Sequence, residues 1–356
     1  MKVLIIYNKI WSYREKIFTL LNQEYDLTVG FSDPKFINTP YKFKTKYLPV
    51  KKAGPFEIHS NNLHKIASEY DVVIGIGSIR WFSLIRLAFK SKRSYKLGYW
   101  GIGVTASYEN KFDSHSTWDK VRFLIAKKSD FTIFYSSYPV KRYVEARIPI
   151  QKLFVANNTT EVRFDGDIER ALKTKKNFLF IGTLYKQKGI DELLDAYYEL
   201  IVQNKNIPDL LIIGDGPERD SIQSFINSKG ISDKVKLYGS IFDPNQISAI
   251  FNEAMVCISP NQAGLSVLTS MGNATCFVTR KDATTGGEIF NIENKINGII
   301  YNKEDNLVEV LQWIIDNPKE VENMNKNAYD FYTKNRTPQM MADVISKAIK
   351  SSIDKK

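Results

Sequence analysis

Short apolar runs alternate with stretches of helical periodicity along the whole chain. Apolar runs of this length are typical of buried strands, and the longer stretches between them repeat apolar residues at helical spacing. Strands that alternate with helices form a parallel sheet with helices on both faces. The first half therefore predicts one α/β domain. Its strand-like runs cover residues 2–7, 26–31, 71–76, 95–100, 131–135 and 153–156.

A polar, charged interval, "NNTTEVRFDGDIERALKTKKN", interrupts the alternation, which then restarts. Because 356 residues exceed what one hydrophobic core usually serves, we predict two doubly wound, Rossmann-like parallel-sheet domains. Ligands of such sheets bind at the carboxyl ends of the strands, so we expect a site in a cleft that the two domains face. The second set of runs covers residues 178–181, 210–213, 235–238, 256–258, 276–279 and 299–301. The predicted parts are an N-terminal domain (1–157), a linker (158–176), a C-terminal domain (177–330) and a helical segment (331–356) that packs back on the first domain.

Composition favours a cytoplasmic protein. No apolar run is long enough to span a membrane, and the first one is too short for a signal peptide. The only cysteines, Cys257 and Cys276, lie in apolar runs, which is typical of buried thiols in a reducing compartment. The chain has too few cysteines and histidines to form a zinc site with the usual ligand spacing, so we expect no metal.

The net charge of +11 favours anionic partners. Residues 35–52 and 79–96 are basic, rich in aromatic residues and free of acids. If 79–96 is a helix, its apolar and basic faces fit a membrane interface, although the same pattern fits a helix that packs on its own sheet. Nucleic acid is disfavoured because no recognition module accompanies the charge. The membrane-interface candidates are Trp81, Phe82, Arg86, Lys90 and Arg93.

Two loops of the second half carry candidate chemistry. After the strand that ends at Gly182, a basic loop leads into a helix, so Lys188 and the helix N-terminus can converge on a phosphate. The bend "SPNQAGLSVLTSMG" has no charged residue, yet the backbone N–H groups of Gly264 and Leu265 open a helix there.

Five ordered motifs between residues 178 and 301 make this half similar to a known family. "FIGTLYKQKGIDELLDAY", "LLIIGDGPERDSI", "KVKLYGSI", "AMVCISP" with "GLSVLTSM", and "GGEIFNIENKINGIIY" resemble the nucleotide-sugar-binding half of the GT-B glycosyltransferases of family 4, the group 1 glycosyltransferases. "YWGIGV" and "KLFVANNTTEV" extend the resemblance loosely into the first half. The resemblance implies a GT-B fold, a retaining reaction and neither metal nor cofactor. The first domain would bind the acceptor and the second the donor.

The resemblance also implies which residues form the site, and this sequence departs from the family's pattern at several of these positions. Thr183 stands where the family has an arginine, while Lys188 keeps the family's lysine. Asn261 and Thr269 replace its two glutamates, and this neutral bend is similar to a capsule and O-antigen branch. Lys188 and backbone N–H groups can still stabilise charge on a leaving diphosphate. The implied catalytic residues are Lys188 and Asn261, the implied donor-binding residues are Gly182, Thr183, Lys186, Gly239, Gly264, Leu265, Thr269 and Glu288, and the acceptor-side candidates are Arg14 and His115.

We therefore predict a retaining glycosyltransferase, peripheral on the inner face of the cytoplasmic membrane. It would move a hexose-type sugar from a nucleotide-sugar donor to an oligosaccharide acceptor, lipid-linked, in surface polysaccharide biosynthesis. A non-catalytic GT-B scaffold, a membrane-associated partner or regulatory subunit, is the alternative. Metal-dependent chemistry at "DGD" (165–167) is disfavoured by its place in the linker, and a dinucleotide site at "GIG" (75–77) by its missing third glycine.

Overall fold

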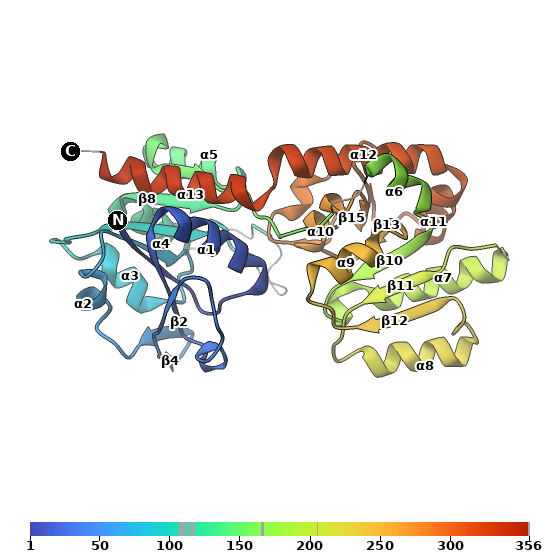
Figure 1. Cartoon of the computed structure of the whole chain (residues 1–356), viewed down its shortest axis with the longest axis horizontal. Helices are drawn as coiled ribbons and strands as arrows, with labels where there is room; N and C mark the ends of the chain where they lie inside the picture. The colour runs from blue at the N-terminus through green and yellow to red at the C-terminus, as the bar shows by residue number, and fades with distance from the viewer. Residues whose placement is uncertain (107–111, 114–117, 165–166, 205, 355–356) are drawn as a thin grey trace. The chain divides into compact units, whose positions relative to one another are not determined.

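The chain forms two compact units (Figure 1). The structure, a computed structural model, describes residues 1–106, 112–113, 118–164, 167–204 and 206–354. Unit 1 contains Met1–Ala106, Phe112–Thr159 and Pro338–Lys356, and unit 2 contains Thr160–Thr337. The last helix of the chain therefore belongs to the same unit as the first strand.

Unit 1 is built on a parallel sheet with the strand order β3-β2-β1-β6-β7-β8-β9. Every strand-like run predicted in the first half is present. The predictions missed β3 and an antiparallel hairpin, β4 (Val50–Ala53) and β5 (Phe56–His59), because exposed lysines break their apolar pattern. The sheet strands are β1 (Lys2–Ile6), β2 (Asp26–Phe31), β3 (Lys44–Tyr47), β6 (Val72–Ile76), β7 (Lys96–Gly101), β8 (Phe131–Phe134) and β9 (Leu153–Val155).

Helices cover both faces of this sheet. Because side chains alternate along a strand, Val3 and Ile5 pack into one cluster, with α1 and α13, while Leu4 and Ile6 pack into another, with α3. Figure 1 shows α13, in red, beside α1. The helices are α1 (Ser12–Glu24), α2 (Leu63–Ala67), α3 (Phe82–Ala88), α4 (Trp118–Lys128), α5 (Val140–Glu145) and α13 (Pro338–Ile353), with short 3-10 turns at Pro34–Phe36 and Ile150–Lys152.

Unit 2 is built on a second parallel sheet, with the order β12-β11-β10-β13-β15-β17. Its strands are β10 (Asn177–Ile181), β11 (Leu210–Ile213), β12 (Val235–Gly239), β13 (Ala254–Ile258), β15 (Cys276–Arg280) and β17 (Gly298–Tyr301). Its helices are α6 (Ile168–Thr174), α7 (Ile190–Gln203), α8 (Arg219–Lys229), α9 (Pro244–Phe251), α10 (Ser266–Gly272), α11 (Leu307–Asp316) and α12 (Pro318–Asn335), with 3-10 turns η3 (Lys186–Lys188) and η4 (Glu288–Asn291). Two loops pair through β14 (Gln262–Ala263) and β16 (Thr284–Thr285).

Each sheet reverses its strand order at one point. In unit 1 the chain leaves β1 towards β2 and later returns to β6 on the other side of β1, and in unit 2 the same reversal separates β10 from β13. This is the doubly wound topology predicted from the alternation, in both units. Loops diverge at such a reversal and leave room for a ligand at the carboxyl ends of the two strands.

The aspartates of the "DGD" motif do not form a described site. Asp165 lies outside the described residues, and Asp167 caps α6 by accepting the backbone N–H of Glu169 at 3.0 Å. An aspartate at a helix N-cap stabilises the helix, so a structural role accounts for Asp167. None of the described helices is long and apolar enough to cross a membrane.

Candidate functional site

The reversal point of unit 2 brings Lys188 against the end of β10. Lys188 closes η3, and Gly189 with a φ of 71° then begins α7. Gly182 follows β10 with a φ of 148°, and a Cβ atom there would clash with Lys188 Nζ, at a distance of 2.3 Å. Glycine at 182 therefore makes room for the ammonium at the carboxyl edge of the sheet.

Lys188 is a half-buried cation without a counter-ion. Its Nζ makes no hydrogen bond or ion pair with any described residue, and burial lowers the pKa of its ammonium. A partly desolvated positive charge that has no protein partner is a candidate for binding an anion, particularly at the edge of a sheet where ligands bind. The nearby N-terminus of α7, which has no side-chain cap, adds a partial positive charge.

Asn261 lies beside Lys188, from the β13 side of the reversal. Its backbone N–H donates to the carbonyl of Lys188 at 3.2 Å, and its side-chain Nδ2 lies 2.6 Å from the position that a Cβ atom of Gly189 would take. Its Oδ1 is buried and accepts no hydrogen bond from a described residue. A buried acceptor that has no donor costs free energy. A hydrogen bond from a ligand hydroxyl would offset that cost.

The uncharged bend that follows has an open face. No atom lies within 4 Å of the position that a Cβ atom of Gly264 would take. α10 begins directly after Leu265, and the first N–H groups of a helix have no acceptor within that helix. The Thr269 hydroxyl donates back to the Leu265 carbonyl at 3.2 Å, which leaves its lone pairs for a ligand donor.

The other predicted donor contacts lie on neighbouring loops. Thr183 and Lys186 are exposed after β10, and Gly239 ends β12, where its carbonyl accepts the N–H of Gly214 at 2.8 Å. Glu288 is only 7% exposed, and its carboxylate accepts the N–H of Gly286 at 2.9 Å. The Glu288 carboxylate thus stabilises its own loop, and its contact with a nucleotide-sugar donor stays a prediction.

Arg280 is a residue of this edge that the sequence reasoning missed. It ends β15, where its N–H donates to the carbonyl of Pro260, and its guanidinium binds Glu192 of α7 at 3.1 Å. Asp282 accepts from the same guanidinium at 2.5 Å. Arg280 therefore connects the first turn of α7 to β15. Its place directly at the end of an apolar run is the feature of the sequence that could have identified it.

The acceptor-side prediction for Arg14 is wrong. Arg14 is 2% exposed inside unit 1, where its guanidinium stacks on Trp100 at 4.9 Å and on Tyr135 at 4.8 Å. It donates to Asn158 Oδ1 at 2.7 Å and contacts Met341 Sδ at 3.2 Å. Trp100 of β7 and Tyr135, which follows β8, enclose the guanidinium, so it cannot face a ligand without rearrangement. His115 lies outside the described residues.

The predicted membrane helix is corrected in part. α3 covers only Phe82–Ala88, and Trp81 is 5% exposed because it packs into the core beneath the helix. Arg93 is also turned away from solvent, since it donates to backbone carbonyls and binds Asp130 at 3.3 Å. Phe82, Arg86 and Lys90 remain exposed.

No described group of three or more His, Cys, Asp or Glu side chains is close enough to hold a metal ion. Cys257 and Cys276 are free and buried, as predicted, and burial raises the pKa of each thiol to about 12.

The residues that carry this site lie in a part of the chain that is similar to a known protein family. Residues 163–331 match the family model "Glycosyl transferases group 1". The alpha-monoglucosyldiacylglycerol synthase of Acholeplasma laidlawii is 24% identical over 206 residues, which cover 56% of this chain and 47% of that protein. The chain spans about half the length of the curated relatives it matches.

Solved structures match over the whole chain. Anabaena Alr3699/HepE in complex with UDP is 16% identical with a TM-score of 0.72, covering 99% of this chain and 100% of that one. The lipopolysaccharide outer core galactosyltransferase WaaB is 17% identical with a TM-score of 0.68, covering 99% of each chain. The chain thus has the fold of the GT-B glycosyltransferases, and residues 163–331 within it match the group 1 glycosyl transferases.

Proposed function

We propose that this protein is a retaining glycosyltransferase that uses a nucleoside diphosphate sugar, and that the donor binds at the β10–β13 reversal of unit 2. The observation that carries the proposal is the unpaired ammonium of Lys188, set against Gly182 and beside the unsatisfied Oδ1 of Asn261. The match to group 1 glycosyl transferases over the same residues supports it, as do the UDP and UDP-glucose in structures of Alr3699/HepE.

The chemistry follows from where charge develops. When the bond between the anomeric carbon and the diphosphate breaks, negative charge grows on the leaving oxygens. A fixed cation in a partly dry site stabilises that charge more than it stabilises the ground state. In this proposal Lys188 supplies the cation, the N–H groups of Gly264 and Leu265 donate to phosphate oxygens, and Asn261 accepts a hydroxyl of the sugar. Thr269 and Glu288 would contact the ribose side.

We further propose that the acceptor is lipid-linked, that the product serves a surface polysaccharide, and that the protein acts on the cytoplasmic face of a membrane. Phe82 and Trp118 are 41% and 43% exposed, and their rings contact that of Phe56, one tilted and one edge-on, at centroid distances of 5.9 and 6.2 Å. Exposed Lys51 and Lys52 lie on the hairpin that contains Phe56. Exposed rings beside lysines suit an anionic lipid surface. The name of the relative from Acholeplasma laidlawii also supports a lipid acceptor.

Release of UDP from UDP-sugars, measured with and without anionic vesicles and in the presence of EDTA, tests this proposal. The wild type should release UDP from one sugar nucleotide without metal, and faster with vesicles. Lys188→Ala should lower both rates by about a hundredfold or more. Phe82→Ser should keep the basal rate and lose the increase with vesicles.

Lys176→Ala is the matched control, because this exposed lysine precedes the amino end of the same strand, β10. It removes the same charge away from the proposed site and should leave both rates unchanged. No turnover of any UDP-, GDP- or CMP-linked sugar by folded protein would contradict the proposal and favour a non-catalytic scaffold.

A further inference from the structure

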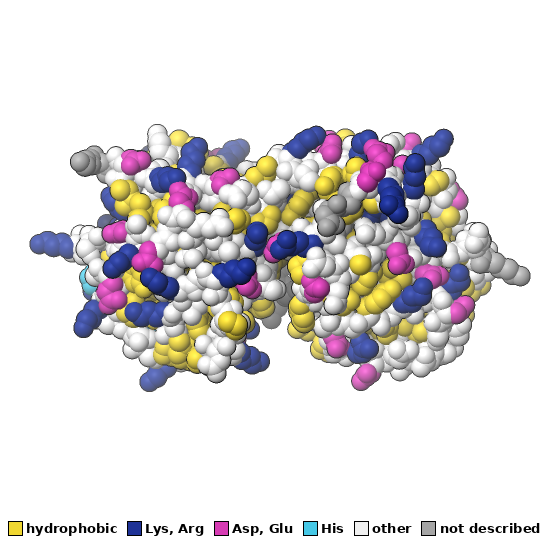
Figure 2. Space-filling model, in the orientation of Figure 1, with side chains coloured by type: hydrophobic (Ala, Val, Ile, Leu, Met, Phe, Trp, Pro, Cys, Tyr) yellow, Lys and Arg dark blue, Asp and Glu magenta, His cyan; other side chains and the backbone are white. Residues whose placement is uncertain are grey.

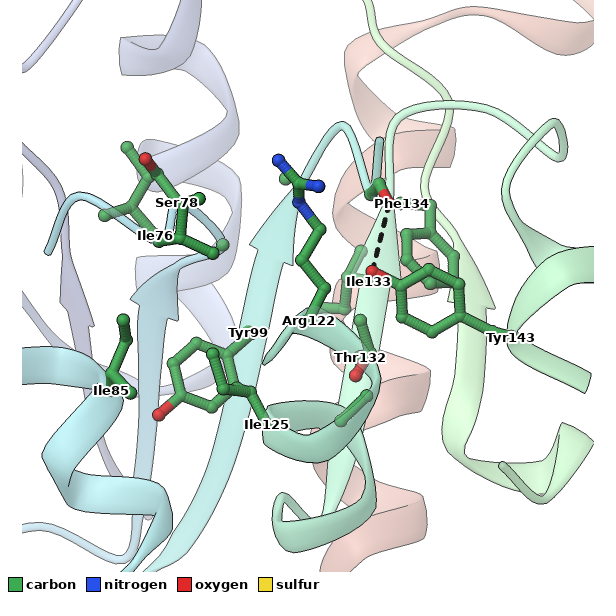
Figure 3. Close-up of a pocket in the computed structure, with 15 residues that line it drawn as sticks. Ile76, Ser78, Ile85, Tyr99, Arg122, Ile125, Thr132, Ile133, Phe134 and Tyr143 are labelled. Carbon is green, nitrogen blue, oxygen red and sulfur yellow. Dashed lines mark hydrogen bonds between the residues drawn. The ribbon is translucent and has the colours of Figure 1, made fainter. Parts of the chain in front are cut away.

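The small cavity of unit 1 is too narrow for a substrate. It lies between β6, β7 and β8 on one side and α3 and α4 on the other, with Ile85, Tyr99 and Ile125 in its walls (Figure 3). Its volume is about 30 Å³, and a space of that size holds roughly one or two water molecules. Such a water would satisfy the hydroxyl of Thr132, which lines the cavity and has no hydrogen-bond partner among the described residues. The groups that can hold a larger ligand lie at the carboxyl edge of the sheet in unit 2.

Three neighbouring strands of unit 2 end at a glycine. Gly182 follows β10, Gly214 follows β11 and Gly239 ends β12. The N–H of Gly214 donates to the carbonyl of Gly239 at 2.8 Å, which keeps the ends of β11 and β12 together. Because glycine has no side chain, a ligand can approach the backbone closely along this row, which spans two strand spacings, about 10 Å.

Arg219 lies at the far end of this glycine row from Lys188. It begins α8, and its Nη1 lies 3.6 Å from the position that a Cβ atom of Gly239 would take. The side chain is half-buried, yet it forms no hydrogen bond or ion pair with a described residue. Asp215 and Glu218, which precede it, each accept a hydrogen bond from a neighbour within the same turn. A guanidinium has five N–H donors and no acceptor, so Arg219 can bind the acceptor atoms of a ligand.

The two unpaired cations suit the two ends of a nucleoside diphosphate. Lys188 lies against Gly182 and Arg219 lies against Gly239, so the glycine row separates them. In the proposed function the diphosphate binds Lys188 and the sugar contacts Asn261, on the β13 side of β10. The base is at the opposite end of the donor molecule, and an extended nucleoside diphosphate is long enough to bring it to the end of β12.

We propose that Arg219 selects the base of the donor. It would bind the keto oxygen at C4 of uracil or C6 of guanine, and disfavour cytosine and adenine, which have an amino group at the same place. Arginine pairs well with a keto oxygen of a base, and it cannot accept a hydrogen bond from an amino group. A site that donates to a keto group therefore rejects the amino analogue more strongly than a difference in shape would. This inference rests on the proposed function and names the class of nucleotide that the same site takes.

Calorimetric titration with UDP and CDP tests the inference, because the two nucleotides differ only in the keto or amino form of the pyrimidine. GDP and ADP form a second pair, with a keto or an amino group at C6. The wild type should bind UDP at least about tenfold more tightly than CDP, or GDP than ADP if it takes purines, the loss of one hydrogen bond to a charged group. Arg219→Gln should bind both members of the pair equally, because an amide side chain can donate or accept. Lys188→Ala should weaken both members to the same extent.

Arg170→Gln is the matched control, because exposed Arg170 lies on α6, before the amino end of β10, and its loss removes the same charge. It should keep the wild-type preference. Arg219→Gln should melt near the wild-type temperature, since Arg219 has no partner to lose. Equal affinity of the wild type for keto and amino bases, or an unchanged preference in Arg219→Gln, would overturn this inference and leave the donor site standing if Lys188→Ala still binds more weakly. Absence of binding by all four nucleotides would overturn the proposed function together with the inference.

Discussion

Lys188 is the residue on which the proposed chemistry depends, and its burial has a measurable consequence. Only the ammonium attracts a diphosphate, so affinity falls as pH rises through the pKa of Lys188. Because burial lowers that pKa, the fall starts at a pH at which an ordinary lysine, with a pKa of about 10.4, is still charged.

UDP affinity measured by calorimetry between neutral pH and about pH 9.4 checks this prediction. The wild type should bind progressively more weakly across that interval, whereas Lys188→Arg should keep a flat profile, because arginine stays protonated. A flat profile for the wild type would show that no titrating lysine contacts the diphosphate.

The positions of single residues were predictable where they depend on local sequence. Lys188 and Asn261 follow the apolar runs of β10 and β13, which lie on either side of the reversal, and the structure joins the two residues through a backbone hydrogen bond. Arg14 was mispredicted because Trp100 and Tyr135, far away in the sequence, enclose its guanidinium.

At the scale of elements, Lys175 connects two helices of unit 2. Its Nζ donates to the carbonyl of Phe251 at the end of α9 at 2.6 Å, to that of Asn273 at the end of α10 at 3.1 Å, and to Thr275 Oγ1 at 2.9 Å. Helix C-termini have unsatisfied carbonyls and a partial negative charge. Lys175 therefore fixes the end of the helix whose start carries the proposed phosphate contacts.

Lys175→Met should destabilise the protein by about 2 kcal/mol at pH 7, because buried carbonyls lose their donor. Burial lowers the pKa of Lys175 to about 7, below its unfolded value of about 10.4. Between those values the unfolded chain binds the extra proton, so wild-type stability should rise with pH.

Urea unfolding of both proteins at pH 7 and pH 9 measures these effects. The gap between wild type and Lys175→Met should widen at pH 9. A variant as stable as the wild type at both pH values would show that the Lys175 side chain contributes nothing to holding the helices.

Elements were predictable in proportion to their burial. All strands of the two main sheets except the exposed β3 were found from apolar runs, since most of them are covered on both faces. The hairpin β4–β5 was missed because its lysines face solvent. α3 was predicted too long, because the basic residues after Ala88 continue the helical pattern in sequence although the helix ends there.

At the scale of the whole molecule, the two units each contain a doubly wound parallel sheet, and each sheet has one point at which the strand order reverses. The alternation of strands and helices was enough to predict both reversal points. The net charge of +11 does not mark a site by itself, because basic side chains are spread among acidic ones over the face seen in Figure 2.

The most direct test of the central claim is a metal-free calorimetric titration with UDP, GDP and CMP of the wild type, Lys188→Ala and Lys176→Ala. One nucleotide should bind the wild type and Lys176→Ala with micromolar affinity, and Lys188→Ala at least about tenfold more weakly, a loss of about 1.4 kcal/mol. Absence of binding by all three nucleotides, or equal affinity of Lys188→Ala, would contradict a donor site at the β10–β13 reversal.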